Sequence, residues 1–458
     1  MLQKIELNKN LKGNNFMSKY IQQAIIFSIV GFLSTAYVPA QSRSRRVTRP
    51  APRSETNKPA TNDNAPLLDV QPTRPTRTTN ESASTASTDS STPASSDTTS
   101  AADTARPATS NANPAKNVSA ANTTAHAYAL LQQKQYAAAA KEAKQIAASN
   151  PNDSEAWKIA GFAEYNLKQY DGAANDLQRA LDLQRAANQE DANTLAALAQ
   201  ALAITEKYDR ALPLLVLATS RQGTSAPDAT LLYYRGVAEY RTNKAQDAER
   251  SFSAAIKANP KDAASLYYLG QLAYARQDLD ATINYLNRAT TSDPRITSAW
   301  ALLTNAYLRR AAAATTVPAR ADADYLSAVR AAENLARLRN DAESNAILGQ
   351  ALIAAKQYAR AAMVLERATT AKDAKGVTFY LLGVAQSRAK NFPKAITALE
   401  RAAVLTPDDA NVYRELGYAY EVSKLYAKAL KAYERGAQLA PNDADFKESI
   451  ERVRPVAK

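Results

Sequence analysis

The chain offers few residues for catalysis. It has 458 residues, with a single histidine, His126, and no cysteine. This excludes HExxH zinc sites, Ser-His-Asp and Cys-His nucleophile systems, disulfides and thiolate metal sites. No glycines form a GxGxxG or GxxxxGK[ST] phosphate loop, and most aspartates and glutamates lie where helix capping explains them. The sequence therefore predicts a protein that is not an enzyme and has no cofactor or metal, with a structural role for His126.

Tyrosine and arginine are the residues that remain for chemistry. The chain has 23 tyrosines, and basic residues are interleaved with them, as in Tyr240-Arg241. A tyrosine combines a rigid apolar ring with a hydrogen-bonding tip, and an arginine adds charge and planar stacking. Such pairs are typical of peptide-binding surfaces. The alternative is that the tyrosines only fill the space between helices.

Pairs of amphipathic helical patterns position these residues. The clearest pair spans residues 411–441 and ends at a proline. The residues whose types and spacing define this pair are Tyr413, Leu416, Gly417 and Tyr420 in the first pattern, Tyr426, Ala429, Tyr433 and Gly436 in the second, and the closing Pro441. This spacing resembles the tetratricopeptide repeat, a helix pair of 34 residues. The resemblance implies an all-α, right-handed solenoid of about nine helix pairs whose neighbours stack to bury a common core.

The same register recurs from residue 120 onward. We place units at 120–153, 154–187, 192–225, 229–262, 263–296, 297–341, 342–375, 376–409 and 410–443. Position 8 of each unit is small, which lets the two helices approach closely. It is occupied by Ala127, Gly161, Ala199, Gly236, Gly270, Thr304, Gly349, Gly383 and Gly417. Position 24 is bulky in most units, and we expect it to fill the space between the helices.

The resemblance also implies which positions face a partner. In tetratricopeptide solenoids the first helices line the concave face, with positions 2, 5, 9, 12 and 13 pointing into a groove. The candidate partner-binding residues are Lys158, Phe162, Tyr165, Tyr233, Tyr240, Arg241, Tyr267, Tyr274, Arg309, Tyr380, Arg388, Arg414 and Tyr418. The chaperone-type carboxylate clamp is absent, because Phe162 replaces its asparagine beside Lys158, and Ala301 replaces its lysine beside Asn305.

Residues 1–40 have the pattern of an export signal. Lys19 is followed by an apolar run at 24–33 and by the small-residue exit Val38-Pro39-Ala40, which predicts a start at Met17 and cleavage after Ala40 or Ala36. The run is too short for a typical membrane span. We therefore expect an exported, periplasmic protein. The alternatives are a secreted protein and one held in the inner membrane by an uncleaved signal.

Residues 41–119 have a composition that cannot form a core. A basic cluster at 43–58 is followed by Ser, Thr, Ala, Pro and Asn with one short apolar patch at 67–70, which predicts a disordered linker. This linker could be a plain spacer or a glycosylated stalk. Alternatively, its arginines could dock the protein on the cell wall or on an anionic membrane surface.

Two features interrupt or end the array. An insertion at 309–324 is expected to lengthen the helices of the sixth unit, with a break at Val317-Pro318 and a new helix near Asp322 or Asp324. The alternative is a projecting ridge that serves as a docking point. After Pro441, a capping helix is expected within 444–458, with Phe446, Ile450 and Val453 on its inner face.

Charge and repeat pattern together favour a binding protein. The net charge of +13 is spread along the chain, without the basic stripe or module that nucleic-acid binding usually requires. We therefore expect a scaffold or adaptor whose groove holds a partner peptide or helix, in cell-envelope assembly or secretion. The alternative is a wall- or polysaccharide-associated structural factor. The sequence indicates neither the partner nor the oligomeric state.

Overall fold

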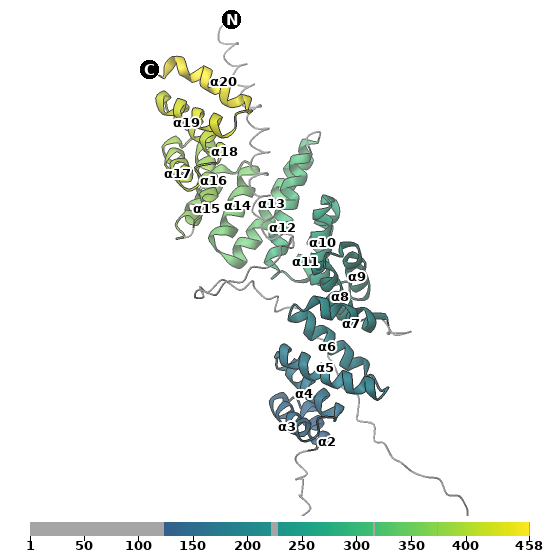
Figure 1. Ribbon diagram of the computed structural model, residues 1–458. Helices are drawn as coiled ribbons and strands as arrows, with labels where there is room; N and C mark the ends of the chain where they lie inside the picture. Colours follow the sequence, from purple (N-terminus) through teal and green to yellow (C-terminus); the bar gives the residue numbers. More distant parts are fainter. Residues whose placement is uncertain (1–122, 221–227, 315–316, 373, 458) are drawn as a thin grey trace, which may run out of the picture. The chain divides into compact units, whose positions relative to one another are not determined.

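The computed structural model describes residues 123–220, 228–314, 317–372 and 374–457 (Figure 1). The predicted signal peptide and linker lie outside these described residues. The chain divides into two compact units. We call residues 123–251 the N-terminal unit and residues 252–457 the C-terminal unit. The boundary falls inside one helix, α9, and each unit is described by itself.

The N-terminal unit is built from helix pairs. The first and second helices of each pair are α2 (Thr124–Gln132) and α3 (Tyr136–Ser149), α4 (Ser154–Asn166) and α5 (Tyr170–Ala186), α6 (Ala192–Ile204) and α7 (Tyr208–Ser220), and α8 (Ala229–Arg241) and α9 (Ala245–Ala258). Each second helix from α3 to α7 packs against its own first helix and against the first helix of the next pair. This alternation is the stacking expected of a repeat array.

The C-terminal unit continues the same alternation. Its helices are α10 (Ala263–Ala275), α11 (Leu279–Ser292), α12 (Thr297–Ala313), α13 (Pro318–Arg339), α14 (Ala342–Ala354), α15 (Tyr358–Thr369), α16 (Gly376–Arg388), α17 (Phe392–Leu405), α18 (Ala410–Val422), α19 (Tyr426–Leu439), α20 (Ala444–Val453) and the 3-10 turn Arg454–Val456. Across the described residues the fold is therefore an all-α solenoid of nine helix pairs followed by one further helix, as the register predicts.

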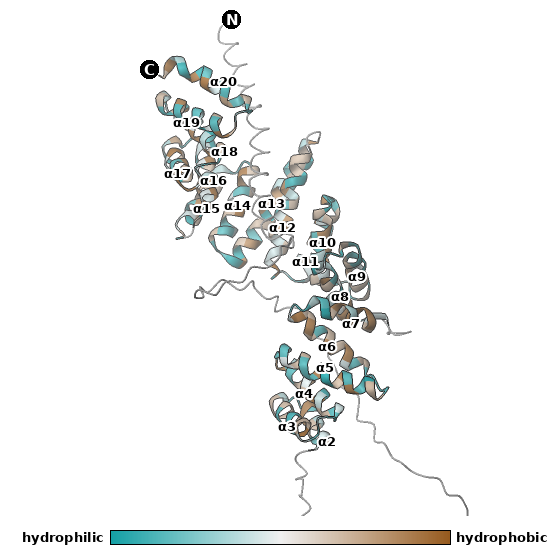
Figure 2. Cartoon of the chain, viewed as in Figure 1, coloured by the Kyte–Doolittle hydropathy of each residue, from teal (hydrophilic) through white to brown (hydrophobic). Residues whose placement is uncertain are grey.

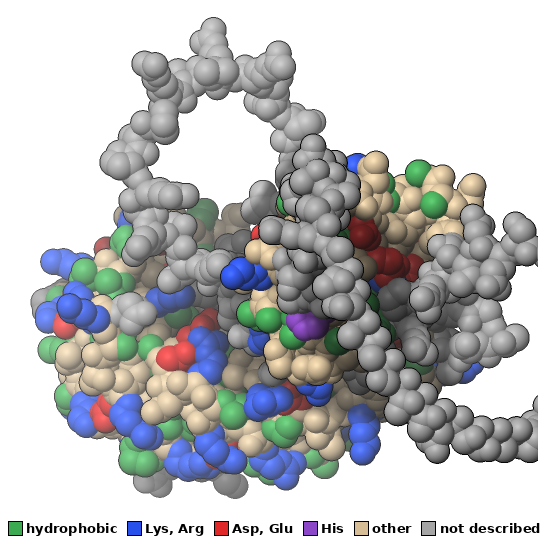
Figure 3. All heavy atoms as spheres, turned by 90° about the horizontal axis from the view of Figure 1, so that it is seen from below, with side chains coloured by type: hydrophobic (Ala, Val, Ile, Leu, Met, Phe, Trp, Pro, Cys, Tyr) green, Lys and Arg blue, Asp and Glu red, His purple; other side chains and the backbone are tan. Residues whose placement is uncertain are grey.

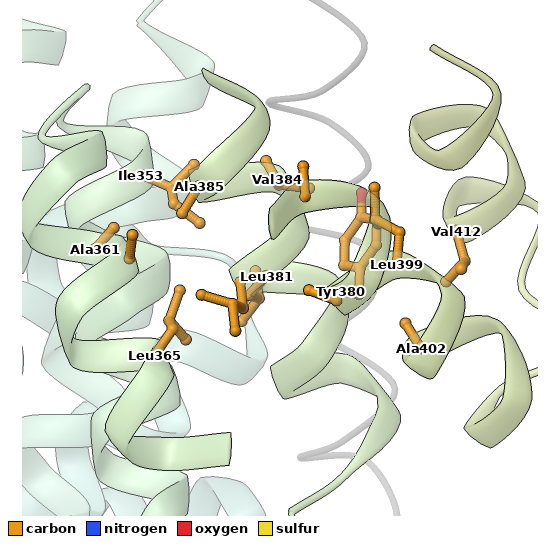
Figure 4. Packing of buried hydrophobic residues seen from close by; sticks show 14 of the residues in the cluster. Ile353, Ala361, Leu365, Tyr380, Leu381, Val384, Ala385, Leu399, Ala402 and Val412 are labelled. Carbon is orange, nitrogen blue, oxygen red and sulfur yellow. The ribbon is translucent and has the colours of Figure 1, made fainter. Parts of the chain in front are cut away.

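Small residues at position 8 lie against the bulky residues at position 24. A Cβ atom added to Gly161, Gly270, Gly349, Gly383 or Gly417 would come closer than 3.0 Å to the position-24 side chain of the same pair. Leu399, for example, packs over Gly383 and is fully buried in the cluster of Figure 4. Only glycine leaves room for such a close approach, so the predicted close contact is confirmed at these five pairs.

Aspartates begin most of the first helices. The side chain of Asp153 accepts a hydrogen bond from the backbone N–H of Ala156 at the start of α4, and an aspartate caps α6, α8, α10, α14, α18 and α20 in the same way. Aspartate is among the best N-cap residues and also interacts favourably with the helix dipole. At these helices the capping interpretation of the acidic residues is confirmed.

The insertion lengthens both helices of the sixth pair. Helix α12 continues to Ala313, as predicted, but α13 begins at Pro318 rather than near Asp322 or Asp324. That part of the prediction was wrong, because proline at the first helical position is favourable: it lacks only an N–H that has no partner there. Asp324 is instead buried inside α13, where both of its oxygens accept hydrogen bonds from Arg310 at 2.9 and 2.7 Å.

Helix α20 covers the last pair with one apolar face. Phe446 and Val453 are each 1 % exposed and Ile450 is half-buried, whereas Lys447, Glu448, Glu451 and Arg452 are exposed. The predicted faces of this capping helix are confirmed. Hydrophobic and hydrophilic residues alternate along the described helices in Figure 2, and none of those helices is long and apolar enough to cross a membrane.

Candidate functional site

Within each of the two compact units, the first helices of successive helix pairs form a continuous row. Direct contacts join α4 to α6 and α6 to α8 in the N-terminal unit, and α10, α12, α14, α16 and α18 in sequence in the C-terminal unit. We call the surface of these rows the first-helix face. All thirteen predicted partner-binding residues lie on first helices, but the structure gives their side chains different environments.

Five of the thirteen side chains are buried. Lys158, Phe162, Tyr165, Tyr233 and Tyr380 are at most 4 % exposed. The hydroxyl of Tyr165 donates to Oε1 of Gln200 on the next first helix at 2.8 Å. Burial raises the pKa of both Tyr165 and Tyr380, so both remain neutral. This placement favours the packing interpretation for these five residues, because a partner at the surface does not reach them.

Two of the predicted cations join neighbouring repeats. Nζ of Lys158 lies 3.4 Å from Asp191, which caps the next first helix. Arg414 forms an ion pair with Asp443, which caps α20, and its guanidinium lies 4.8 Å from the ring centroid of Phe446. The charge at position 5 thus holds the next helix start in place, a role that the sequence analysis did not assign.

Arg388 and Tyr418 form a partly buried cluster with Glu415. Nη2 of Arg388 donates to Oε1 of Glu415 at 3.0 Å, and the guanidinium lies 5.6 Å from the ring centroid of Tyr418. The Glu415 side chain is almost fully buried. This ion pair joins α16 to α18, so Arg388 is engaged within the protein.

Tyr267, Tyr274 and Arg309 remain at the surface of the C-terminal unit. All three are half-buried, and the Tyr267 hydroxyl accepts a hydrogen bond from the Gln271 side chain at 2.7 Å. The guanidinium of Arg309, on α12, lies 4.9 Å from the ring centroid of Tyr274, on α10. Stacking on an aromatic ring holds an arginine in one orientation while leaving its N–H groups free to donate.

Arg309 differs from its neighbour Arg310 in having no ion-pair partner among the described residues. Arg310 forms ion pairs with Asp324 at 2.7 Å and with Asp280 at 2.5 Å. Arg309 has no carboxylate within ion-pair distance among the described residues. Of these two adjacent cations on α12, one stabilises the insertion and the other is available to an anionic group.

Tyr240 and Arg241 lie at the end of α8 in the N-terminal unit. Tyr240 is half-buried and Arg241 is exposed, with its guanidinium 6.0 Å from the ring centroid of Tyr208 on α7. These two residues remain accessible candidates in this unit.

A buried carboxylate pair escaped the sequence analysis. Glu164 and Asp176 are 6 and 7 % exposed, and both form ion pairs with Lys144, which lies 3.5 Å from Asp176. Burial, with Glu164 beside it, raises the pKa of Asp176 to about 6. Nothing in the sequence distinguishes these two acids from exposed ones, because their burial results from the packing of α3, α4 and α5.

The described residues give little material for catalysis or metal binding. His126 is half-exposed, and its Nδ1 lies 2.9 Å from each oxygen of Glu142, which supports a structural role. In the described part of the chain no group of three or more His, Cys, Asp and Glu residues could hold a metal ion. Figure 3 shows Lys and Arg side chains dispersed over the visible face among hydrophobic and polar ones.

Comparison with known proteins identifies the repeat. The family model described as tetratricopeptide repeat matches residues 124–193, 239–295 and 380–444, so these segments carry tetratricopeptide repeats. No curated protein sequence gives a significant match.

Several solved structures resemble the chain. YrrB, described as a TPR protein with an unusual peptide-binding site, is 17 % identical and has a TM-score of 0.37, over 44 % of this chain and 99 % of YrrB. MamA from Desulfovibrio magneticus RS-1 is 23 % identical with a TM-score of 0.35, over 40 % and 97 %. The Cut9–Hcn1 hetero-tetramer is 13 % identical with a TM-score of 0.36, over 71 % and 88 %. At these values the similarity carries no argument about function.

Proposed function

We propose that this protein is a non-enzymatic scaffold that binds a peptide or helix of a partner protein on its first-helix face. Tetratricopeptide repeats expose a row of first helices that a partner segment can contact along its length. Within that row, the site proposed in the C-terminal unit consists of Tyr267, Tyr274 and Arg309.

The stacked pair of Tyr274 and Arg309 carries the proposal. Both side chains belong to first helices, both are half-buried, and the arginine is oriented without being neutralised by the described residues. Tyrosine, tryptophan and arginine are enriched among the few residues that contribute most of the binding energy of protein interfaces. A partner that places a carboxylate or a backbone carbonyl over Arg309 gains a charge-assisted hydrogen bond.

Crosslinking in the native cell, followed by mass spectrometry, tests this proposal. The full chain with Tyr274→Ala and Arg309→Glu is compared with Arg288→Glu, which reverses an exposed charge on the second helix α11. We expect the double variant to lose crosslinks to a partner protein that the wild type and the control variant retain. Unchanged crosslinks in all three proteins would contradict a partner site on this face.

The cellular setting is a second part of the proposal. Its support is the signal-like pattern of residues 1–40, and the function that fits it is assembly of the cell envelope or secretion. Intact-mass measurement of the protein from the periplasmic fraction is expected to show a chain that begins at Gln41. A mature protein that retains residues 20–35 would contradict cleavage.

A further inference from the structure

The turns inside the helix pairs share an unusual backbone conformation. At position 15 of eight of the nine repeats, the backbone angle φ lies between 59° and 64°, in the left-handed region that favours glycine. The residues are Lys134, Lys168, Glu206, Asn243, Gln277, Lys356, Lys390 and Lys424, and none is glycine. A residue with a side chain costs about 1 kcal/mol in this region, so backbone preference does not explain five lysines among eight.

The last three of these turns place lysines in one row. Lys356, Lys390 and Lys424 follow one another at intervals of one repeat, and all three are exposed. Within the described ranges none of the three has a carboxylate partner. Each lysine is followed two residues later by a half-buried aromatic residue and four residues later by a second exposed cation. The aromatic residues are Tyr358, Phe392 and Tyr426, and the second cations are Arg360, Lys394 and Lys428.

These turns join the first and second helices of three successive stacked pairs, so they lie along one edge of the stack. The ring of Phe392 lies 6.4 Å from that of Tyr418 on the next first helix. Nζ of Lys394 reaches Glu366 on the preceding second helix at 3.1 Å. We call the three lysines and the three second cations the basic turn edge.

The second cations are only weakly neutralised. Arg360 pairs with Glu333 at 2.7 Å and Lys394 with Glu366, but both cations are more than half exposed. Lys428 lies 5.3 Å from the ring centroid of Tyr420. Exposed ion pairs of this kind contribute little and exchange readily for another anion.

The equivalent turns of the N-terminal unit lack this arrangement. Lys134 and Lys168 occupy the same backbone position and are also exposed, but Ala138 and Gly172 follow where the second cations lie in the other unit. Asp171, an exposed acid, directly follows the aromatic residue of its turn. The paired cations are therefore a property of the last three repeats and not of the repeat fold.

We propose that the basic turn edge is a second interaction surface, which binds an extended acidic segment of a partner polypeptide. A carboxylate of such a segment fits between the two cations of a turn, and an apolar neighbour fits on the half-buried ring. Each of the last three repeats supplies two cations and one aromatic ring, which suits a partner segment that runs across the turns from one repeat to the next. This surface is separate from Tyr267, Tyr274 and Arg309.

The observations favour a polypeptide over a lipid layer or a nucleic acid. Glu366, Glu400 and Glu434 lie on the same second helices as the cations, about two helical turns beyond the turns, so acids alternate there with the exposed Arg367, Arg401 and Arg435. A membrane presents anions over an area, and a nucleic acid presents them continuously along its backbone. Either one would therefore bring negative charge next to these glutamates, which repel it. A polypeptide segment that follows only the turns avoids them.

Fluorescence anisotropy with the full chain tests the proposal. The probe is a fluorescein-labelled peptide in which glutamates alternate with leucines, and the same peptide with lysines in place of the glutamates is the charge control. Lys390→Gly/Lys424→Gly is compared with Lys134→Gly/Lys168→Gly. Both double variants remove two exposed lysines from the same backbone position, and glycine suits that backbone, so neither change threatens folding.

The expected result is a difference between the two double variants. Lys390→Gly/Lys424→Gly is expected to weaken binding of the acidic peptide about fivefold to thirtyfold, as two exposed charge contacts are lost. Lys134→Gly/Lys168→Gly is expected to bind like the wild type. Equal weakening in both variants, or no weakening in the first, overturns the proposal. Tighter binding to anionic vesicles or single-stranded DNA than to the peptide also overturns it, if that binding is lost in Lys390→Gly/Lys424→Gly.

Discussion

The two units share one packing rule and differ in charge. Gly161 lies under Leu177 in the N-terminal unit as Gly383 lies under Leu399 in the C-terminal unit. Residues 123–251 contain 14 Lys and Arg against 15 Asp and Glu, a net charge of −1. Residues 252–457 contain 28 against 21, a net charge of +7. The difference shows that the repeat fixes what is buried and leaves the exposed charges free to specialise.

Loss of a buried cation is expected to have the largest effect on stability. Arg388→Met leaves Glu415 buried without its partner and should cost about 3 kcal/mol. Urea unfolding monitored by circular dichroism measures the change. The double variant Arg388→Met/Glu415→Gln is expected to recover part of the loss, because no buried charge remains. A single variant as stable as the wild type would show that Glu415 is solvated.

Overpacking is expected to affect both units equally. Gly161→Leu and Gly383→Leu each force a side chain into space that Leu177 or Leu399 fills, at a cost of about 1–3 kcal/mol. Hydrogen exchange of peptides from each unit reports where the protein opens. Ala359→Leu, at an exposed position of α15, is the control. If only one of the two glycine variants opens its own unit, the shared packing rule fails.

The pH dependence is expected to differ between the units. The pKa of Asp176 is about 6 in the folded protein, above its ordinary value of 3.8, so the folded state binds more protons. Its contribution is fully present below pH 3.8 and is lost as pH rises through 6. The free energy of unfolding is expected to change by about 1 kcal/mol less over this pH range in Asp176→Asn than in the wild type. Partial solvation of the site keeps the figure below the value that the full pKa shift would give.

Hydrogen exchange at several pH values tests this difference. Peptides from the N-terminal unit are expected to become less protected from about pH 5 to about pH 7.5 in the wild type but not in Asp176→Asn. The groups that face Asp176 are Glu164 and Lys144. An unchanged pH profile in the variant would show that Asp176 is not the group responsible for the pH dependence.

Replacement of the left-handed turn residues is expected to have the smallest effect. Lys168→Gly and Lys390→Gly each relieve an unfavourable φ, which changes stability by at most about 1 kcal/mol, in the stabilising direction. Thermal unfolding measures the shift. Destabilisation of Lys390→Gly alone would mean that this lysine side chain contributes to folding in the C-terminal unit.

Much of the fold could be predicted from sequence, because its rules are local and repeat. The small residue at position 8, the bulky residue at position 24 of most repeats and the aspartate before most first helices recur at a fixed spacing, so one repeat predicts the others. The start of α13 could not be placed in this way. The pattern predicts a break at Pro318, but proline is also a favourable first residue of a helix.

The candidate site was less predictable. The resemblance to the tetratricopeptide repeat places Tyr165, Tyr233 and Tyr380 in a groove with Tyr267 and Tyr274, because all five occupy position 5 or 12 of their repeats. Burial separates them, and burial depends on the neighbouring repeat. Lys158 and Arg414 likewise lie beside the helix start of the next repeat, a contact that no single repeat reveals.

The sequence by itself determined the helix pairs and their register, since both follow from residue types at a fixed spacing. Only the tertiary structure decided which tyrosines are buried, which arginines are neutralised and which exposed lysines have no carboxylate partner among the described residues. The physical reason is that burial and ion pairing depend on distances between repeats, whereas periodicity records only what happens within one.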